Sequence, residues 1–356
     1  MATLFERLVK TFRLALVTVS ACALLVAHGS AQSSGSALTL GLFERYLDAL
    51  RLEFGIPGLS VAVVEDGRTW ERAFGKSDVN ANVNATATTP YPITGLTESI
   101  GASIALYQCV ELGRGRLTDR ILRWTPFTEP TTTIENLLSH TSAEGQYRYD
   151  PGRYSTLTDV AGECAKAEFD DLLADTVLSG FAMVDSVPGL DAVSSPRSRF
   201  FTTAQLDRYS NALRRVAVPY RLDSKGVATR SDYSPAPGVS AATGVISTVR
   251  DLAQFDTALA DGVMLSPSLL AQAWNSPSGR PTGLGWFVQQ YSGQRIVWQF
   301  GVATDAYSSL IVKIPDRRLT LILLANSDRL TNTLNPQAPD VTQSVFARTF
   351  LRLFIS

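Results

Sequence analysis

Three hydroxyl side chains and one carboxylate lie close together between residues 97 and 103. Thr97, Ser99 and Ser103 are candidate nucleophiles for acyl transfer, and Glu98 is a candidate base. A hydroxyl attacks only when a base takes its proton, so the two groups must lie within hydrogen-bond distance. Ser99 and Ser103 stand about one helical turn apart, where serine hydroxyls often bond to carbonyls of the preceding turn. The stretch therefore fits either a nucleophile site or an ordinary helix.

The chain is poor in the side chains that usually carry metal and acid–base chemistry. Its 356 residues include 2 His and 3 Cys. The lysines are Lys10, Lys76, Lys166, Lys225 and Lys313. Of its two histidines, His28 lies in residues 1–31, which we expect to be removed as a signal peptide, so only His140 remains. A multi-histidine metal site is therefore excluded, and we expect neither a metal nor another cofactor. A formal net charge of −1 creates no basic field, so we expect no nucleic acid partner.

Residues 1–31 have the pattern of a secretory signal peptide. Basic residues precede the apolar run Leu14–Ala27, and small residues follow it up to Ala31. We expect cleavage after Ala31 and an exported protein, periplasmic or secreted. The run is short for a transmembrane helix, and no other segment has the roughly 20 apolar residues that a span requires. Val19–Cys22 also resembles a lipoprotein box, which would leave a lipid anchor on Cys22. Because the apolar run continues past Cys22, we favour soluble export.

Two cysteines, Cys109 and Cys164, remain after the signal segment. An exported protein can form a bridge between them. Both lie in apolar helical stretches, however, and a free cysteine is commonly buried there as a small hydrophobic residue. We therefore expect two buried free thiols, with a disulfide as the alternative.

Strand patterns stand at both ends of the chain, with helical patterns between them. Leu38–Phe54 has helical spacing, and Leu59–Val64 with Thr69–Phe74 predicts a hairpin. Further strands are predicted at Gly283–Gln290, Arg295–Phe300, Tyr307–Lys313 and Leu319–Ala325, before an amphipathic helix at Val341–Phe354. We predict an α/β (α+β) fold: one antiparallel sheet built from both chain ends and flanked by helices, with a large, mostly helical insert.

Four stretches carry a resemblance to a known family. They are Gly55–Val64, Glu135–Ser142 with the letters ENLLSHTS, Gly244–Leu252, and Leu319–Ser327. In this order they resemble the serine β-lactamase and penicillin-binding-protein superfamily, and most of all its class C-like β-lactamase-related hydrolases. The resemblance covers nearly all of residues 32–356. It implies one β-lactamase/transpeptidase-like domain with an α/β lobe at 37–92 and 262–356 and a helical lobe at 93–261.

The resemblance implies three catalytic motifs, and each is altered here. The Ser-x-x-Lys position falls on Gly95 and Glu98, so both the nucleophile and the lysine are missing. No lysine occurs between Lys76 and Lys166, so this loss does not depend on the alignment. Tyr-x-Asn falls on Tyr149-Asp150-Pro151, which keeps the tyrosine and replaces the amide by Pro151. Lys/His-x-Gly falls on Gln299-Phe300-Gly301, where a neutral amide replaces the cation or histidine.

These changes predict a protein without serine hydrolase activity. A glycine supplies no nucleophile, and an anionic Glu98 raises the pKa of Tyr149 above its usual value of about 10, which makes the phenol a poor base. Removing such groups costs about 10⁴–10⁶ in turnover. We therefore interpret the chain as a catalytically inactive homologue. The alternative is a divergent esterase, D-peptidase or β-lactamase that uses Thr97, Ser99 or Ser103.

The altered site can still bind a ligand. The resemblance implies that backbone N–H groups at the positions of Gly95 and Val302 hold an oxygen atom of the substrate. These N–H groups do not depend on the side chains at the two positions. We expect a cell-wall-like peptide or a carboxylate to bind there, or a partner protein. The candidate ligand-binding residues are Gly95, Tyr149, Gln299, Phe300, Gly301 and Val302, with Tyr147 and Trp298 beside them.

Ordinary structural roles also fit these residues. Glu98 is a good first-turn helix residue after an N-cap at Gly95. Tyr149 fits a core tyrosine equally well. We interpret His140 as a structural residue of a turn, the role that the resemblance implies for it.

Overall fold

The computed structural model describes residues 37–235, 237–277 and 279–355. The expected signal peptide, its cleavage site and Cys22 lie outside these residues. The described residues divide between two units, with the boundary between residues 47 and 48. Residues 37–53 are helical. Within the described ranges, no helix is both long enough and apolar enough to span a bilayer.

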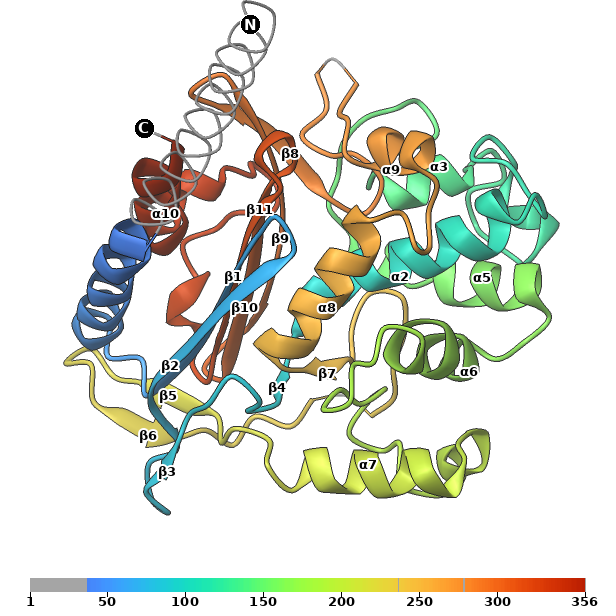
Figure 1. Ribbon diagram of the computed structural model, residues 1–356. Coiled ribbons are helices and arrows are strands. Elements are labelled where there is room, and N and C mark those ends of the chain that lie inside the picture. The colour runs from blue at the N-terminus through green and yellow to red at the C-terminus, as the bar shows by residue number, and fades with distance from the viewer. Residues whose placement is uncertain (1–36, 236, 278, 356) are drawn as a thin grey trace, which may run out of the picture. The chain divides into compact units, whose positions relative to one another are not determined.

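A seven-stranded antiparallel sheet organises residues 48–356 (Figure 1). Its order is β3-β2-β1-β11-β10-β9-β8. The strands are β1 Gly58–Glu65, β2 Arg68–Asp78, β3 Val83–Asn84, β8 Phe287–Tyr291, β9 Gln294–Ala303, β10 Tyr307–Ile314 and β11 Leu319–Ala325. The predicted antiparallel sheet from both chain ends is confirmed.

The two central strands, β1 and β11, pair Leu59 with Ala325 at one end and Glu65 with Leu319 at the other. Every residue of β11 is buried, as is every residue of β1 except Glu65. Mostly apolar runs of this kind, interrupted here only by the buried Ser60 and Thr320, suit a strand that is covered on both faces. Helices cover both faces: α8 (Val249–Ala260) and α10 (Val345–Ile355) lie on opposite sides of the sheet in Figure 1.

Helices are the commonest regular structure in the middle of the chain, as expected, and one more helix follows the last strand. They are α2 Thr97–Ala105, α3 Ile134–Leu138, α4 Pro151–Tyr154, α5 Leu157–Ala165, α6 Phe169–Asp171, α7 Thr203–Leu213, α8 Val249–Ala260, α9 Pro267–Ala273 and α10 Val345–Ile355. Short 3₁₀ helices include η1 Thr94–Leu96 and η8 Val341–Gln343, and the wider turns η2 Leu106–Glu111 and η4 Leu172–Ser179 are π-helical. Two small ladders pair β4 Tyr91–Pro92 with β7 Ile246–Ser247, and β5 Tyr220–Leu222 with β6 Ala228–Arg230.

Two of the predicted elements begin four residues later in the structure. Strand β8 begins at Phe287 and not at Gly283, because Gly285 has a φ of 81° and turns the chain away from an extended path. A side chain at Gly285 would also lie 2.2 Å from the Cβ of Ala102, so helix α2 passes directly beside this turn. The last helix begins at Val345, after the separate 3₁₀ turn that Asp340 caps.

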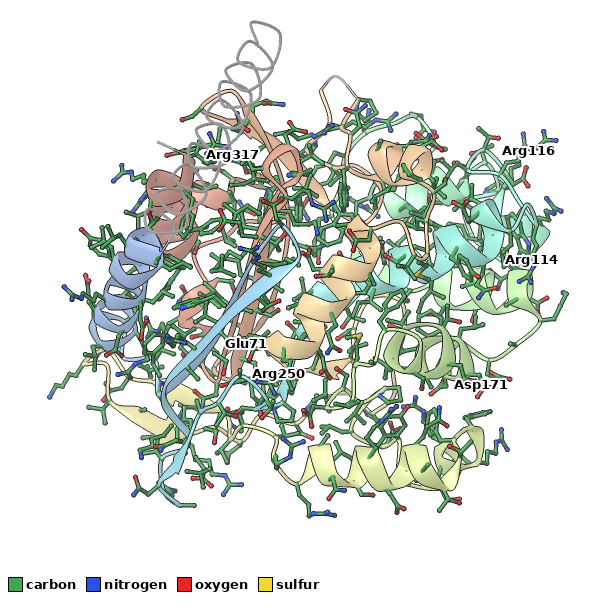
Figure 2. All side chains as sticks on the ribbon, in the orientation of Figure 1. Glu71, Arg114, Arg116, Asp171, Arg250 and Arg317 are labelled. Atoms are coloured by element: carbon green, nitrogen blue, oxygen red, sulfur yellow. A yellow bond between two sulfur atoms is a disulfide. The ribbon has the colours of Figure 1, made fainter. Side chains whose placement is uncertain are left out.

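Ion pairs fasten α8 to the sheet. Arg250 of α8 and Glu71 of β2 point toward one another in Figure 2, with Arg250 Nη2 2.6 Å from Glu71 Oε2. A second, buried pair joins Asp256 of α8 to Lys313 of β10. The ammonium of Lys313 also lies 4.7 Å from the ring centre of Trp274. These contacts fix the helix against the face of the sheet that bears the altered motifs.

A buried carboxylate at the start of α8 makes the stability of the fold sensitive to pH. Asp251 Oδ2 accepts bonds from Ser186 Oγ (2.7 Å) and Asp185 N (2.8 Å), whereas Oδ1 has no partner among the described residues. Burial raises the pKa of Asp251 to about 6. The folded state therefore holds this proton more tightly than the unfolded state, and stability falls as the pH rises through about 6.

We expect this group alone to lower the unfolding free energy by about 1 kcal/mol between about pH 5 and pH 8. Urea unfolding across that range measures the effect, and D251N should lose this part of the pH dependence. The exposed Asp207 provides the control, since D207N should retain it. Identical pH profiles for D251N and the wild type would contradict the prediction.

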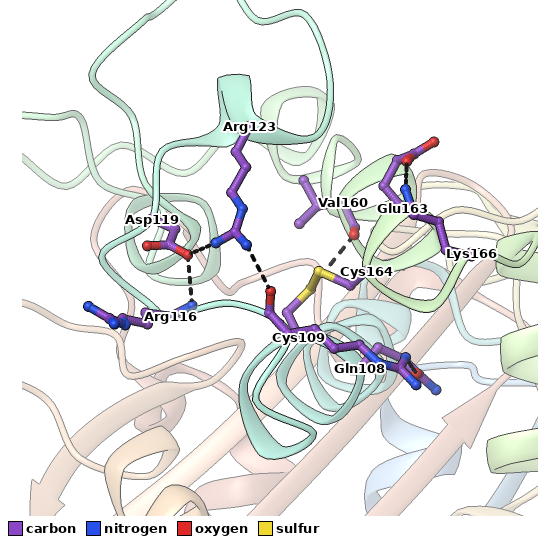
Figure 3. The surroundings of a disulfide bond; sticks show 10 residues. Gln108, Cys109, Arg116, Asp119, Arg123, Val160, Glu163, Cys164 and Lys166 are labelled. Carbon is purple, nitrogen blue, oxygen red and sulfur yellow. Dashed lines mark hydrogen bonds and ion pairs between the residues drawn. A yellow bond between two sulfur atoms is a disulfide. The ribbon is translucent and has the colours of Figure 1, made fainter.

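Cys109 and Cys164 form a disulfide, so the expectation of two free thiols was wrong (Figure 3). The expected burial is correct, because their exposed fractions are 0% and 7%. Helix α5 packs against η2 and brings the two Cα atoms to 5.3 Å, within the usual range for a bridge. The sequence shows that each helix is apolar, but it does not show that these two turns face one another.

Candidate functional site

The candidate site lies where η1 and α2 meet strand β9. The chain enters η1 through Thr94, which has a φ of 50°, and Glu98 follows in the first turn of α2 with no exposed surface. Strand β9 approaches η1 closely and places Gln299 and Gly301 beside it. The loop between α3 and α4 adds His140 and Tyr149 from another side. Three separate segments thus build the site.

Glu98 is the centre of the site. Its carboxylate accepts three hydrogen bonds: from Tyr149 Oη to Oε1 (3.0 Å), and from Gln299 Nε2 (3.1 Å) and His140 Nε2 (3.2 Å) to Oε2. Because all three partners donate, they hold Glu98 as an anion. Buried carboxylates need such partners, since each unsatisfied polar group costs free energy. Glu98 is therefore more than a favourable residue for the first turn of a helix, because it is the shared acceptor of three side chains.

His140 belongs to this cluster, which the sequence interpretation as a turn residue missed. Its backbone has a φ of 51°, and its ring stacks on Tyr154 with ring centres 4.7 Å apart. Nδ1 accepts a hydrogen bond from the backbone N–H of Asp150 (3.2 Å), so the proton of the neutral ring lies on Nε2 and is donated to Glu98. The one available signal was that His140 is the only histidine after residue 28.

Tyr149 is half-buried between Glu98 and the ring of His140, whose centre is 4.5 Å away. Burial raises the pKa of Tyr149 far above its ordinary value, and the charge of Glu98 raises it further. The expected effect of the Glu98 anion is therefore confirmed, with burial as the larger cause. Tyr149 keeps its proton at neutral pH and cannot act as a phenolate base.

Gly95 stands where the resemblance implies a nucleophile. A Cβ atom at this position would lie 3.5 Å from Tyr149 Oη and 3.1 Å from the carbonyl oxygen of Phe300. Gly95 is partly exposed. The site therefore brings the nucleophile position next to the tyrosine, as the motif alignment predicts, but it places no hydroxyl there.

The alternative nucleophiles lie inside the helix. Thr97, Ser99 and Ser103 are 1–2% exposed. Ser99 Oγ donates to Leu96 O (2.8 Å) and Ser103 Oγ to Ser99 O (2.9 Å), so both hydroxyls bond to the preceding turn. Thr97 Oγ1 is buried without a partner among the described residues. None of the three is hydrogen-bonded to Glu98 or Tyr149.

Strand β9 presents a free edge to the site. Phe300 N–H bonds to the Oε1 of its neighbour Gln299 (2.9 Å) and so points away from β10. Backbone groups two residues apart point the same way, which directs the N–H of Val302 toward this edge as well. Trp298, Phe287 and Phe300 stack beside it, with ring centres 4.6–5.9 Å apart. Val302 itself is 42% exposed.

Gly301 allows β9 and η1 to approach one another. A Cβ at Gly301 would lie 2.0 Å from Thr94 Oγ1 and 2.7 Å from Gly95 N, distances that real atoms do not adopt. We expect G301A to lower the unfolding free energy by about 1–3 kcal/mol, because the strand must move away from the site. Urea unfolding tests this. Gly41 is the control, since its helical position has nothing within 4 Å and G41A should not destabilise the protein.

A cavity of about 590 Å³ opens beside Tyr147. Its lining includes Arg153, which is paired with Glu129 at 2.9 Å and also donates to Thr141 O at 2.8 Å. Tyr147 lines this cavity too, and its hydroxyl donates to Pro336 O. In the described part of the chain, no three His, Cys, Asp or Glu side chains form a group that could hold a metal ion.

The fold matches solved structures of the β-lactamase and penicillin-binding type. The octameric penicillin-binding protein homologue from Pyrococcus abyssi has a TM-score of 0.69 at 19% identity, over 88% of this chain and 77% of that one. D-amino acid amidase from Ochrobactrum anthropi SV3, complexed with L-phenylalanine amide, has a TM-score of 0.70 at 17% identity, over 89% and 97%. A class C β-lactamase from Rhodobacter sphaeroides has a TM-score of 0.66 at 14% identity, over 88% and 98%. At these identities the likeness establishes the fold.

A sequence model of the Beta-lactamase family matches residues 43–342, and the chain belongs to that family. Among curated proteins, the unguisins hydrolase ungD' of Aspergillus campestris (strain IBT 28561) is 23% identical over 325 residues, or 78% of this chain and 60% of that protein. Penicillin-binding protein 4 of Amycolatopsis lactamdurans is 30% identical over 212 residues, or 54% and 55%. The matches span 55–60% of the length of these relatives.

Proposed function

We propose that this protein no longer forms the acyl-enzyme of a serine hydrolase and binds a peptide-like ligand non-covalently. One observation carries the proposal: Glu98 lies in the lysine position of the motif and is held by Tyr149, His140 and Gln299. A lysine there would favour loss of a proton from the nucleophile and the tyrosine, whereas a carboxylate opposes it.

The absence of a hydroxyl at Gly95 supports the same conclusion independently. The nearest hydroxyls on the helix, those of Ser99 and Thr97, are buried, and that of Ser99 is bonded to the backbone. A divergent hydrolase that uses them would need the first turns of α2 to rearrange. Burial of these groups therefore argues against the alternative activity.

The remaining polar groups suit recognition of a peptide. The free edge of β9 offers the carbonyl oxygen of Phe300 and the backbone groups of Val302, while the N–H of Phe300 is already bonded to Gln299 Oε1. The rings of Phe300 and Phe287 are 4% and 1% exposed, so the recognition rests on the main chain and not on these rings. An extended ligand can add to such an edge through main-chain hydrogen bonds. Of the two ligands that the sequence suggests, a peptide fits better than an isolated carboxylate, because Glu98 places a negative charge next to the binding point.

Covalent labelling tests the proposal. The purified chain is incubated with fluorescent penicillin and, separately, with a fluorophosphonate, and the adduct is measured by intact-protein mass spectrometry. We expect no adduct, with an active serine β-lactamase as the positive control. A stoichiometric adduct would overturn the proposal, and its loss in S99A or T97V would then identify the nucleophile of the alternative hydrolase.

We also propose that the protein is exported with cleavage after Ala31. The basic and apolar pattern of residues 1–31 supports this. The mass of the mature protein recovered from the periplasm or medium of the expressing cell measures the cleavage site. A chain starting at a lipid-modified Cys22 would support the lipoprotein alternative and contradict this one.

A further inference from the structure

The cavity beside Tyr147 is a second place where a ligand has room to bind. Its volume of about 590 Å³ lies within the usual range of small-molecule sites. The residues that line it come from 128–131 and 141–148, together with Arg153, and not from the positions of the altered motifs. Whatever binds in this cavity therefore does not need the nucleophile position at Gly95.

Arg153 is a fixed hydrogen-bond donor in the wall of the cavity. Its side chain is 9% exposed, and it donates from Nε (3.1 Å) and Nη2 (2.9 Å) to Glu129 Oε2. Nη2 also donates to Thr132 Oγ1 (3.1 Å), and Nη1 donates to Thr141 O (2.8 Å). A guanidinium has five N–H groups, so these four bonds leave one N–H on Nη1. Because the group is already held in place, a ligand that accepts from it need not order the side chain.

Glu129 supplies an acceptor beside this donor. All the bonds that its carboxylate accepts, from Arg153 and from Thr132 Oγ1 (2.9 Å), go to Oε2. Oε1 has no hydrogen-bond partner in the part of the chain that the structure describes, and the side chain is 41% exposed. One ion pair thus offers a ligand one acceptor and one donor. Hydroxyl groups both donate and accept, so two neighbouring hydroxyls can use both groups.

The charges around the cavity favour a neutral ligand. Glu129 is paired with Arg153, and Arg148 is paired with Asp150 at 3.2 Å. Glu144 is the remaining charge of the lining, and it is exposed, so water and salt screen it. A carboxylate or an ammonium group would enter without a counter-ion of its own, which costs free energy that a neutral polar group does not pay.

We propose that this cavity binds a neutral saccharide. Two vicinal hydroxyls bond with Glu129 Oε1 and Arg153 Nη1, and the C–H face of the sugar ring packs on the half-buried ring of Tyr147. The bond from the Tyr147 hydroxyl to Pro336 O holds that ring in place. This site goes beyond the peptide binding proposed above and does not depend on it.

Isothermal titration calorimetry on the full chain at neutral pH tests the proposal. The neutral probes are cellotetraose, maltotetraose and the tetramer of N-acetylglucosamine. The charged probes are the glucosamine tetramer and tetragalacturonate, and a blocked tetraalanine represents a neutral peptide. We expect at least one neutral saccharide to bind with a Kd of about 1 mM or tighter, and at least about tenfold more tightly than either charged probe and the peptide.

Two pairs of variants locate the binding in the cavity. E129Q keeps the size of the side chain, and its amide oxygen can still accept from Arg153, but an N–H donor then replaces the free acceptor. We expect E129Q to weaken saccharide binding at least about tenfold, whereas E168Q is the control, since the exposed Glu168 borders a different cavity. Y147A should weaken binding by a similar factor, while Y147F, which keeps the ring, should retain it.

Each result decides the proposal. No binding of any neutral saccharide at 10 mM, tighter binding of a charged probe, or tighter binding of the peptide would overturn it. Unchanged saccharide binding in both E129Q and Y147A would also overturn it, and thermal unfolding shows that each variant is folded. A covalent penicillin adduct would instead overturn the proposed function and leave this site untouched, so the two failures are distinguishable.

Discussion

Replacing Glu98 by leucine is expected to lower the unfolding free energy by about 3 kcal/mol, because the change removes the acceptor of buried donors. Gln299 is 2% exposed and His140 is 4% exposed, so their N–H groups have no water to bond with. Leaving each of them without a partner costs about 1–3 kcal/mol. Tyr149 is half-buried and can turn to solvent, so it adds little. Urea unfolding at neutral pH measures the loss.

The matched variant for this prediction is E98Q, whose amide oxygen still serves both N–H groups. It should cost less than half as much as E98L. If E98L is as stable as the wild type, the donors of Gln299 and His140 have found other partners, and Glu98 does not organise the site as described. The comparison therefore separates the loss of hydrogen bonds from the loss of charge.

Removing the disulfide in C109A/C164A is expected to destabilise the protein by about 4 kcal/mol, since the bridge closes a loop of 55 residues. The effect arises mainly in the unfolded state, where the cross-link limits the conformations of the chain. Thermal or urea unfolding of the variant and the wild type measures it. The helical part of the protein, where η2 and α5 meet, should respond first.

Reductant provides the control for this prediction. The wild type should lose a similar amount of stability when it is unfolded with reductant present, while C109A/C164A should not respond. Peptide mapping without reduction should recover the peptides of Cys109 and Cys164 linked to one another. Recovery of both as free thiols would contradict the structure at this point.

The sheet could be predicted from sequence because its strands follow local rules. Each carries a run of apolar or β-branched residues between turn residues, as Leu59–Val64 and Leu319–Ala325 illustrate. The start of β8 could not, because the φ of Gly285 depends on the passage of α2 beside it. The prediction of two free cysteines was wrong for the same reason. Contact between two helices far apart in sequence depends on tertiary packing, and the spacing of apolar residues along each helix does not predict it.

In the candidate site, too, part of the arrangement could be predicted from the sequence and part could not. Alignment of the motifs predicts that Gly95, Tyr149 and Gln299 come together, and the distances at Glu98 agree. Alignment does not predict what Glu98 does once it replaces a lysine, because that depends on which neutral donors surround it. His140 was missed for this reason, since it is 42 residues away along the chain and its role is defined by its partner.

The pairing of β1 with β11 has a consequence for the order in which the protein can fold as it is synthesised. The amino-terminal hairpin leaves the ribosome with one side of β1 unpaired, and its partner, Leu319–Ala325, is made only near the end of translation. Until then, a nearly uncharged strand edge is exposed, which is a typical starting point for aggregation. Contacts between such distant segments also form slowly. We therefore expect a nascent chain of this protein to be prone to aggregation until β11 is made, and a chain truncated before residue 319 to keep that edge of β1 without its partner strand.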